Sequence, residues 1–429
     1  MGEKKEKSGF SKYLGLTFLI GCGFFTMGLM DPLYDTYVPI FLRRYINSNA
    51  LVGAIMTLDN VLQLFLIPVI AVWSDRTRTK IGRRMPFIVV MLPISAVLFH
   101  FIPVMAASSL WALILILFCF NIFKTSIRGP IVALMPDTIP ADYRSEANGV
   151  INTMGGVGTI IGTLVLAQLM RIKEGLPFTI TAVCIFAAVL ILLFFVHERT
   201  PDPSEEAEEH VPVLKAIKMV FTSRNAGGKK DYSLLLILVS LLFWFMAEQG
   251  AKPFLGLYMV DVLGVSASNA ALAQGVAGVA GVLCAVLSGY LAHKVGRRRY
   301  IRICLVVLAL ILFLIPVVSN LGIKFGLGGN VMLILLLALM FIYGAFWVGV
   351  TVNSFPMIWQ MATFGNVGIY TGLYYTFSQS AAILAPPIAG LIIDLAGYNG
   401  IFIFGGVCMA IAWCTMGGVR RGEASDSST

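Results

Sequence analysis

Long apolar runs alternate with short polar stretches along the whole chain. An α-helix rises 1.5 Å per residue, so about 20 apolar residues cross the roughly 30 Å hydrocarbon layer of a bilayer. The pattern predicts an all-α membrane protein with about twelve transmembrane helices. These spans are expected at about residues 13–42, 50–73, 86–106, 109–135, 146–170, 176–197, 232–260, 266–292, 300–318, 331–355, 367–393 and 399–418.

One hydrophilic stretch, at about 198–231, is longer than the others. It begins with several glutamates and ends rich in lysine and arginine, which is typical of a solvated linker. It separates six predicted spans from six more. We therefore expect an N-terminal six-helix half at 1–197, a cytoplasmic linker at 198–231 and a C-terminal six-helix half at 232–429.

The two halves echo each other. The loop after the second span contains Asp75 and a basic cluster that follows Gly82. The loop after the eighth span contains a similar basic cluster, with His293 where the first loop has Asp75. Two parallel repeats that meet at a central pathway are typical of transporters that work by rocking.

Composition and charge narrow the class of protein. Of the 429 residues, 58% are hydrophobic and 12% are charged, and the mean hydropathy is +0.87. Soluble proteins carry roughly 25% charged residues, so a soluble enzyme, a disordered chain and a collagen-like chain are excluded. The net charge is +9, but most basic residues lie between the spans on the same side as the N-terminus. Because basic loops face the cytoplasm, we expect a protein of the cell membrane with cytoplasmic termini, in contact with lipids and not with nucleic acid.

The sequence offers no set of residues for enzyme chemistry. The seven cysteines form no CxxC or Cys/His ligand pattern, the four histidines are scattered, and no phosphate-binding GxxxxGK[ST] string is present. We therefore expect no enzyme activity, no metal and no bound cofactor. The energy for any transport must then come from an ion gradient.

Short strings in the first half resemble a known family. The loop after the second span reads SDRTRTKIGRRMPF from Ser74 to Phe87, and the fourth span contains RGP from Arg128 and ALMPD up to Asp137. The loop resembles the signature of the major facilitator superfamily. The fuller strings resemble bacterial relatives of sucrose–proton symporters in the glycoside–pentoside–hexuronide symporter group. The resemblance implies two pseudo-symmetric six-helix halves, a functional monomer and a small-molecule substrate, here a sugar.

The signature loop is also expected to act as a gate on the cytoplasmic side. A carboxylate such as Asp75 can accept hydrogen bonds from helix N-terminal amides and from arginine side chains, while Gly82 permits a tight turn. Asp137 and Arg144 form a second possible gate, for which the alternative is an ordinary surface ion pair. The expected gating residues are Asp75, Arg76, Gly82, Arg83, Arg84, Asp137 and Arg144.

Four acids and three bases fall inside the predicted spans. Such charges are costly in a membrane and usually face a cavity. Mutual pairing leaves one acid over, and a lone buried carboxylate takes up a proton. For Glu248 and Lys252, one helical turn apart, a local structural pair is an equal alternative. The seven charged residues are Asp31, Asp35, Asp59, Lys124, Arg128, Glu248 and Lys252.

The coupling ion is expected to be H⁺. The resemblance argues against a sodium site of the usual kind. Melibiose-type symporters carry the acids of such a site at the places where this chain has Gln63, Ile67 and Arg128. The expected proton carriers are Asp31, Asp35, Asp59 or Glu248.

Sugar recognition needs flat apolar surfaces and side chains that bond to hydroxyl groups. The second half supplies both, with Trp244 and Trp347 as the main candidates. The alternative is that these aromatic side chains only pack or lie at the membrane interface. The expected substrate-binding and coupling residues are Asp31, Asp35, Asp59, Asn60, Gln63, Asn121, Lys124, Arg128, Trp244, Glu248, Gln249, Trp347, Tyr375 and Gln379.

These features together predict a secondary active transporter that imports a sugar or glycoside by proton symport through alternating access. The alternatives are a sodium-coupled sugar symporter and an exporter or antiporter of amphipathic compounds. An exporter favours an apolar pathway, whereas this chain places Asp59, Lys124 and Arg128 inside its spans.

Overall fold

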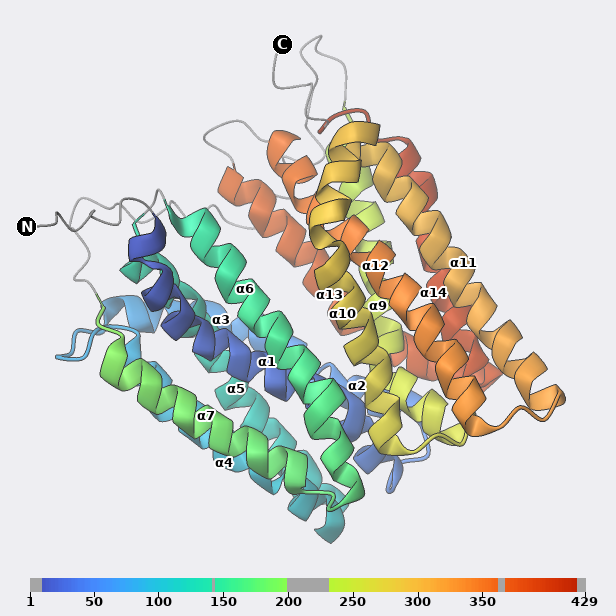
Figure 1. The fold of residues 1–429 in the computed structure, drawn as a ribbon, viewed down its shortest axis with the longest axis horizontal. Coiled ribbons are helices and arrows are strands. Elements are labelled where there is room, and N and C mark those ends of the chain that lie inside the picture. Colours follow the sequence, from blue (N-terminus) through green and yellow to red (C-terminus); the bar gives the residue numbers. More distant parts are fainter. Residues whose placement is uncertain (1–9, 141–142, 199–230, 362–366, 423–429) are drawn as a thin grey trace, which may run out of the picture. The chain divides into compact units, whose positions relative to one another are not determined.

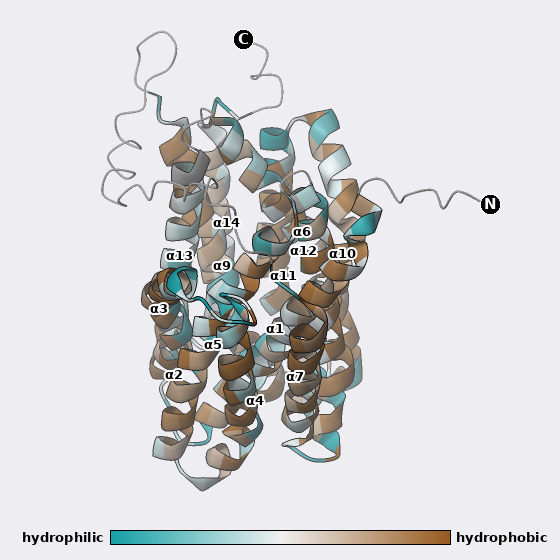
Figure 2. Cartoon of the chain, turned by 90° about the vertical axis from the view of Figure 1, so that its left-hand side faces the viewer, coloured by the Kyte–Doolittle hydropathy of each residue, from teal (hydrophilic) through white to brown (hydrophobic). Residues whose placement is uncertain are grey.

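The computed structural model describes residues 10–140, 143–198, 231–361 and 367–422. The elements in these ranges are helices, and twelve helical segments are long and apolar enough to cross a membrane. The prediction of an all-α membrane protein with twelve spans is thus confirmed. Figure 2 shows hydrophobic residues along much of α4 (Met85–Ser108) and α7 (Leu176–Phe195), with hydrophilic residues at helix ends and in loops.

The chain forms two compact units. Unit 1 comprises Met1–Tyr45 and Leu58–Glu205, and unit 2 comprises Ile46–Thr57 and Glu206–Thr429. All but the ends of the linker predicted at 198–231 lies outside the described residues. The remaining helices of unit 1 are η1 (Phe10–Lys12), α1 (Leu14–Arg43), α3 (Leu58–Arg76), α5 (Leu110–Thr138), α6 (Arg144–Ile160), η3 (Ile161–Val165) and η4 (Leu166–Arg171). Those of unit 2 are α2 (Asn49–Met56), α9 (Ser233–Asp261), α10 (Ala267–Val295), α11 (Arg297–Lys324), α12 (Gly329–Met361), α13 (Val367–Ala396) and α14 (Asn399–Gly417).

Within unit 1, α1 packs along α6, α4 lies against α5 and α7, and α3 lies against α5 (Figure 1). The α1–α6 pair is close because a Cβ atom at Gly158 would overlap the carbonyl oxygen of Phe25. Small residues let the backbones of membrane helices approach in this way. The contact fixes α1 beside α6, and α1 carries two of the predicted site acids, Asp31 and Asp35.

Within unit 2, α10 packs along α12, and α9 packs against both α13 and α14. The helix α11 lies against α12 and α14. The unit thus gathers α9, α12 and α13, the three helices that carry the predicted site residues of the second half.

The second predicted span, at 50–73, is not one continuous helix. It consists of α2 and α3, separated at Thr57, whose hydroxyl donates to the carbonyl oxygen of Ala54 at 2.8 Å. The break coincides with the boundary of the units, because α2 packs on α13 in unit 2 and α3 packs on α5 in unit 1. Hydropathy alone cannot show such a break, since both parts are apolar.

The N-terminus of α2 is bound to Asp394 on α13. The Asp394 carboxylate accepts hydrogen bonds from the backbone N–H of Asn49 at 2.8 Å and of Ala50 at 3.0 Å. It also accepts bonds from the side chains of Ser48 and Asn49, each at 2.8 Å. A Cβ at Gly53 would overlap Pro386, so the two helices touch backbone to backbone. We call this set of contacts the α2–α13 clamp.

Candidate transport site

Unit 1 contains a cluster of opposite charges contributed by three helices. The Nζ atom of Lys124 on α5 lies 2.7 Å from Asp31 Oδ1 on α1 and 3.9 Å from Asp59 Oδ2 on α3. The exposed fractions of these side chains are 9% for Lys124, 13% for Asp59 and 38% for Asp31. We call these three residues the charged cluster.

Aromatic and amide groups surround the lysine. Lys124 Nζ lies 4.9 Å from the ring centre of Tyr34 and 5.9 Å from that of Phe120. The amide of Asn121 donates to the Tyr34 hydroxyl at 2.8 Å. These contacts hold the ammonium group over ring faces, which attract cations. Asn121 and Lys124, three residues apart on α5, are both buried.

The other predicted residues of unit 1 surround this cluster to different degrees. Asp59 lies at the start of α3, where its Oδ1 accepts from the backbone N–H of Asn60 at 2.7 Å. Gln63, one turn further along α3, is buried. Asp35 follows Asp31 by one turn on α1 and is half-buried. Arg128, in contrast, is exposed and does not share the burial of Lys124.

In unit 2, a carboxylate lies beside several aromatic rings. The Tyr343 hydroxyl on α12 donates to Glu248 Oε2 on α9 at 2.7 Å. The Tyr343 ring stacks on Trp347 with centres 6.3 Å apart, and Phe245 meets Trp347 edge-on at 5.7 Å. We call Phe245, Tyr343 and Trp347, with the carboxylate of Glu248, the aromatic cluster.

The remaining predicted residues of unit 2 differ in exposure. Trp244 is completely buried, and its indole N–H has no hydrogen-bond partner among the described residues. Gln249 and Gln379 are half-buried, whereas Tyr375 is 56% exposed and packs edge-on against Phe355.

The signature loop forms an ion-pair network within unit 1. Asp137 at the end of α5 pairs with Arg83 at 2.5 Å and with Arg84 at 2.9 Å. Arg84 also pairs with Asp75 and is buried. The hydrogen bond to Asp137 raises the pKa of the Arg83 guanidinium above its ordinary value. The network ties the ends of α3, α4 and α5 together.

Asp137 has partners among the described residues, whereas the predicted pair of Asp137 with Arg144 stays a prediction. Asp137 binds Arg83 and Arg84, and the Arg144 side chain lies outside the described part of the chain. Arg76 is exposed. The N-terminal amides expected to bind Asp75 are bound by another carboxylate.

That carboxylate is Glu198, which directly follows the last transmembrane helix of unit 1. It accepts backbone hydrogen bonds from Arg83 at 2.7 Å, from Arg84 at 2.8 Å and from Met85 at 2.6 Å. Gly82 has φ +113°, and a Cβ there would overlap the Glu198 carboxylate. The sequence reasoning missed Glu198, although an acid just after a predicted span is a usable signal for a helix cap.

Among the residues that the structure describes, no group of three or more His, Cys, Asp or Glu side chains could hold a metal ion. The chemistry that the described clusters offer is therefore proton binding, ion pairing and aromatic stacking.

Comparison with known proteins places the chain in a family. The model of the Major Facilitator Superfamily matches residues 16–383. Multidrug resistance protein MdtG of Proteus mirabilis (strain HI4320) is 23% identical over 400 residues, which cover 90% of this chain and 89% of that protein. MdtG of Salmonella dublin is 28% identical over 186 residues, or 42% of this chain and 43% of that protein.

Solved structures agree on the fold. The nucleoside transporter NupG superposes with a TM-score of 0.74 at 12% identity, over 94% of this chain and 100% of that chain. A bacterial homologue of the human lysosomal transporter Spinster superposes with a TM-score of 0.70 at 15% identity, over 95% of this chain and 97% of that chain. The relatives are named for multidrug resistance, so the resemblance to sugar symporters is confirmed only at the level of the superfamily. The chain belongs to the Major Facilitator Superfamily and is a secondary transporter of small molecules, not an enzyme.

Proposed function

We propose that this protein exports amphipathic organic compounds in exchange for protons. The observation that carries the proposal is the similarity to MdtG, a protein named for multidrug resistance, over 90% of the chain. Sugar import, the main reading of the sequence motifs, becomes the second candidate.

The aromatic cluster supports this substrate class. Flat rings such as Trp347 and Phe245 offer apolar surface without requiring a fixed pattern of hydroxyl groups. Glu248 adds a single negative charge, held by Tyr343. A surface of this kind suits molecules that combine an apolar body with one polar or cationic group.

The charged residues of unit 1 are compatible with an exporter because they are paired. Lys124 lies between Asp31 and Asp59, so its positive charge is compensated, and one negative charge remains on the cluster. A remaining negative charge is compatible with a solute that carries a cationic group.

The charged cluster is the proposed proton site. One lysine faces two carboxylates, so the ionised cluster carries one negative charge that a proton neutralises. A proton on Asp59 leaves Lys124 paired with Asp31 alone and frees α3 from its ion pair with α5. Such a change in pairing gives the two protonation states different preferred helix arrangements, which is what coupling requires.

Proton-coupled sugar import is the second candidate, favoured by the loop string from Ser74 to Phe87. Amide side chains near the clusters, such as Gln63 and Gln249, could bind hydroxyl groups. We also propose that both termini are cytoplasmic, that a cytoplasmic linker joins two six-helix halves, and that the protein acts as a monomer.

The direction of the gradient separates the two functions. The purified protein is placed in proteoliposomes with an imposed pH gradient, and uptake of a permanently charged amphipathic cation is compared with uptake of labelled sucrose and maltose. Proton antiport predicts that the cation accumulates when the lumen is acidic. Accumulation of sugar with an acidic exterior would establish sugar symport instead, and stimulation by a sodium gradient alone would exclude the proton as the coupling ion.

Matched variants test the proton site. Asp59→Asn is expected to reduce gradient-driven transport at least tenfold, because it removes one proton acceptor from the cluster. Glu174→Gln is the control, since Glu174 is an exposed carboxylate paired with Arg44 outside the cluster. Equal loss of transport in both variants would contradict the assignment.

A further inference from the structure

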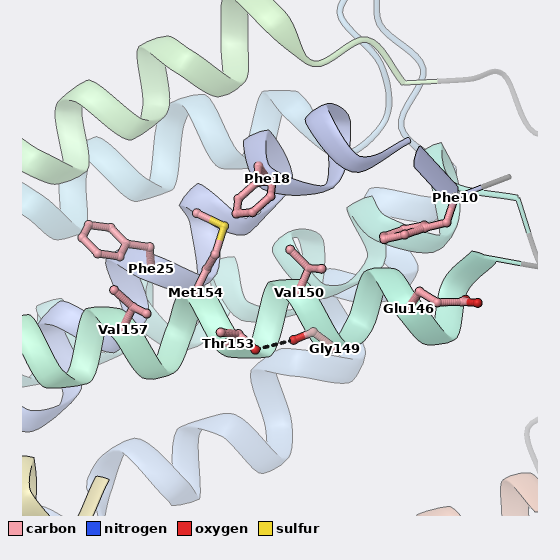
Figure 3. Close-up of a pocket in the computed structure, with 9 residues that line it drawn as sticks. All are labelled: Phe10, Phe18, Phe25, Glu146, Gly149, Val150, Thr153, Met154 and Val157. Atoms are coloured by element: carbon pink, nitrogen blue, oxygen red, sulfur yellow. Dashed lines mark hydrogen bonds between the residues drawn. The ribbon is translucent and has the colours of Figure 1, made fainter. Parts of the chain in front are cut away.

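Unit 1 contains an apolar groove that shares no residue with the charged cluster. It has a volume of about 660 Å³ and lies along one side of α1 and α6 (Figure 3). We call it the α1–α6 groove. Its lining residues are Phe10, Phe18, Phe25, Glu146, Gly149, Val150, Thr153, Met154 and Val157.

The groove is apolar along its length and acidic at one end. Figure 3 shows Phe25 and Val157 at one end and Phe10 and Glu146 at the other. Glu146 is the single charged residue in the lining and is exposed. Within the described ranges, the Glu146 side chain forms no ion pair or hydrogen bond.

Aromatic rings gather at the acidic end. The ring of Phe10 lies 6.5 Å from that of Tyr143, and Tyr13 lies 5.5 Å from Tyr143. Of these three rings, only that of Phe10 lines the groove, and a ring face together with a carboxylate attracts organic ammonium groups. This end of the groove therefore fits a cation and disfavours an anion.

Size narrows the ligand further. The volume of about 660 Å³ is many times the roughly 30 Å³ that one water molecule takes up in the liquid, so the groove can hold an organic molecule. Along α6, Glu146 and Val157 are separated by about 16 Å at 1.5 Å per residue. That length suits a single alkyl chain of about 12 carbons.

We propose that the α1–α6 groove binds single-chain amphiphilic organic cations. The ammonium group lies between Glu146 and the ring of Phe10, and the alkyl chain follows Phe18 and Val157. The inference rests on the proposed function, because it names the class of amphipathic compound and a binding site for it.

The test is photolabelling of the full-length protein in lipid nanodiscs. The probe is an alkyltrimethylammonium with a chain of about 12 carbons that carries a photoreactive diazirine. A probe with the same chain and a neutral hydroxyl head is the comparison. We expect the cationic probe to label peptides of α1 and α6, and Glu146→Gln to reduce this labelling about fivefold to tenfold.

Two further variants address the chain and the fold. Phe18→Ala is expected to reduce labelling by either probe, whereas Phe101→Ala, at an exposed aromatic position on α4, should not change it. Equal labelling by the cationic and neutral probes, unchanged in Glu146→Gln, would overturn the proposal and show that the groove holds any apolar chain. Labelling of the groove in detergent that is lost in phospholipid nanodiscs would assign the groove to membrane lipid and equally overturn the proposal.

The exporter proposal and the groove proposal can each fail without the other. Specific labelling without gradient-driven export would leave the groove standing and refute the exporter. Export of the cation with normal rates and labelling in Glu146→Gln would leave the exporter standing and refute the groove as its site.

Discussion

Lys124 is the residue on which the buried charges of unit 1 depend. Its ammonium group lies beside both Asp31 and Asp59. The Lys124 side chain is nearly as buried as the apolar side chains around it. Removing one member of a buried charge set leaves the others uncompensated, and the cost exceeds the net value of the interaction itself.

We therefore expect Lys124→Gln to destabilise the protein by about 3–5 kcal/mol and to abolish coupled transport. The double variant Lys124→Gln/Asp31→Asn should recover part of the stability, because it removes one of the two acids left behind. Unfolding in detergent, followed by helix content, compares the unchanged protein, Lys124→Gln, Asp31→Asn and the double variant in a double-mutant cycle. A double variant whose loss of stability equals the sum of the two single losses would show that the two side chains are not energetically coupled.

Gly82 is a second residue whose role follows from geometry. Its φ of +113° is strained for any side chain, and a Cβ would collide with Glu198. Gly82→Ala is expected to cost about 1–3 kcal/mol and to release Glu198 from the amides of Arg83 and Arg84. Gly289→Ala is the control, because Gly289 lies in α10 with open space around its Cα. Thermal unfolding of both variants should show a loss only for Gly82→Ala.

At the scale of helices, the division of the second span into α2 and α3 organises the fold. The α2 helix has eight residues, which is short for an independent helix. Its stability must come from α13, through the Asp394 cap and the backbone contact at Gly53. The cap resembles an ordinary N-cap except that the carboxylate comes from another helix.

Asp394→Ala is expected to destabilise unit 2 by about 1–2 kcal/mol and to increase amide hydrogen exchange in α2. Asp394→Asn should cost less, because the amide oxygen can still accept one of the backbone bonds. Asp261→Ala provides a control at another exposed acid near a helix end, whose partner is the Tyr398 hydroxyl. Unchanged exchange in α2 of the Asp394→Ala variant would contradict the clamp.

The described residues contain twelve candidate spans, an even number, and we therefore predict that both ends of the chain lie on one side of the membrane. The excess of basic residues in alternate loops predicts that this side is the cytoplasm. Reporter fusions at the C-terminus and in the loop near Lys324 test this orientation. A fluorescent protein should be active at the C-terminus, and alkaline phosphatase should be active after Lys324. The opposite pattern would reverse the topology.

Hydropathy could predict the twelve spans because each is a long apolar run. The hydrogen bonds that join distant parts of the chain could not be predicted from hydropathy or helical spacing. Glu198 lies 115 residues from Arg83, and Asp394 lies 345 residues from Asn49. The position of Glu198 just after a predicted span marks it as a possible helix cap, but local sequence does not show which amides either acid binds. The break at Thr57 was hidden because its cause is the packing of α2 on α13, not a change in hydropathy.

The place of α2 in unit 2 also has a consequence for biosynthesis. The residues of α2 leave the ribosome with the first half of the chain, whereas Asp394 is made 345 residues after Asn49. At about 5–20 residues per second, the helix waits roughly 20 to 70 s for its partner. During that time α1 and α3 can assemble with the rest of unit 1, but α2 has no α13 to pack against. Unit 2 therefore cannot be completed from the second half of the chain alone, and a protein expressed as two separate halves must still insert α2 from the first into the second.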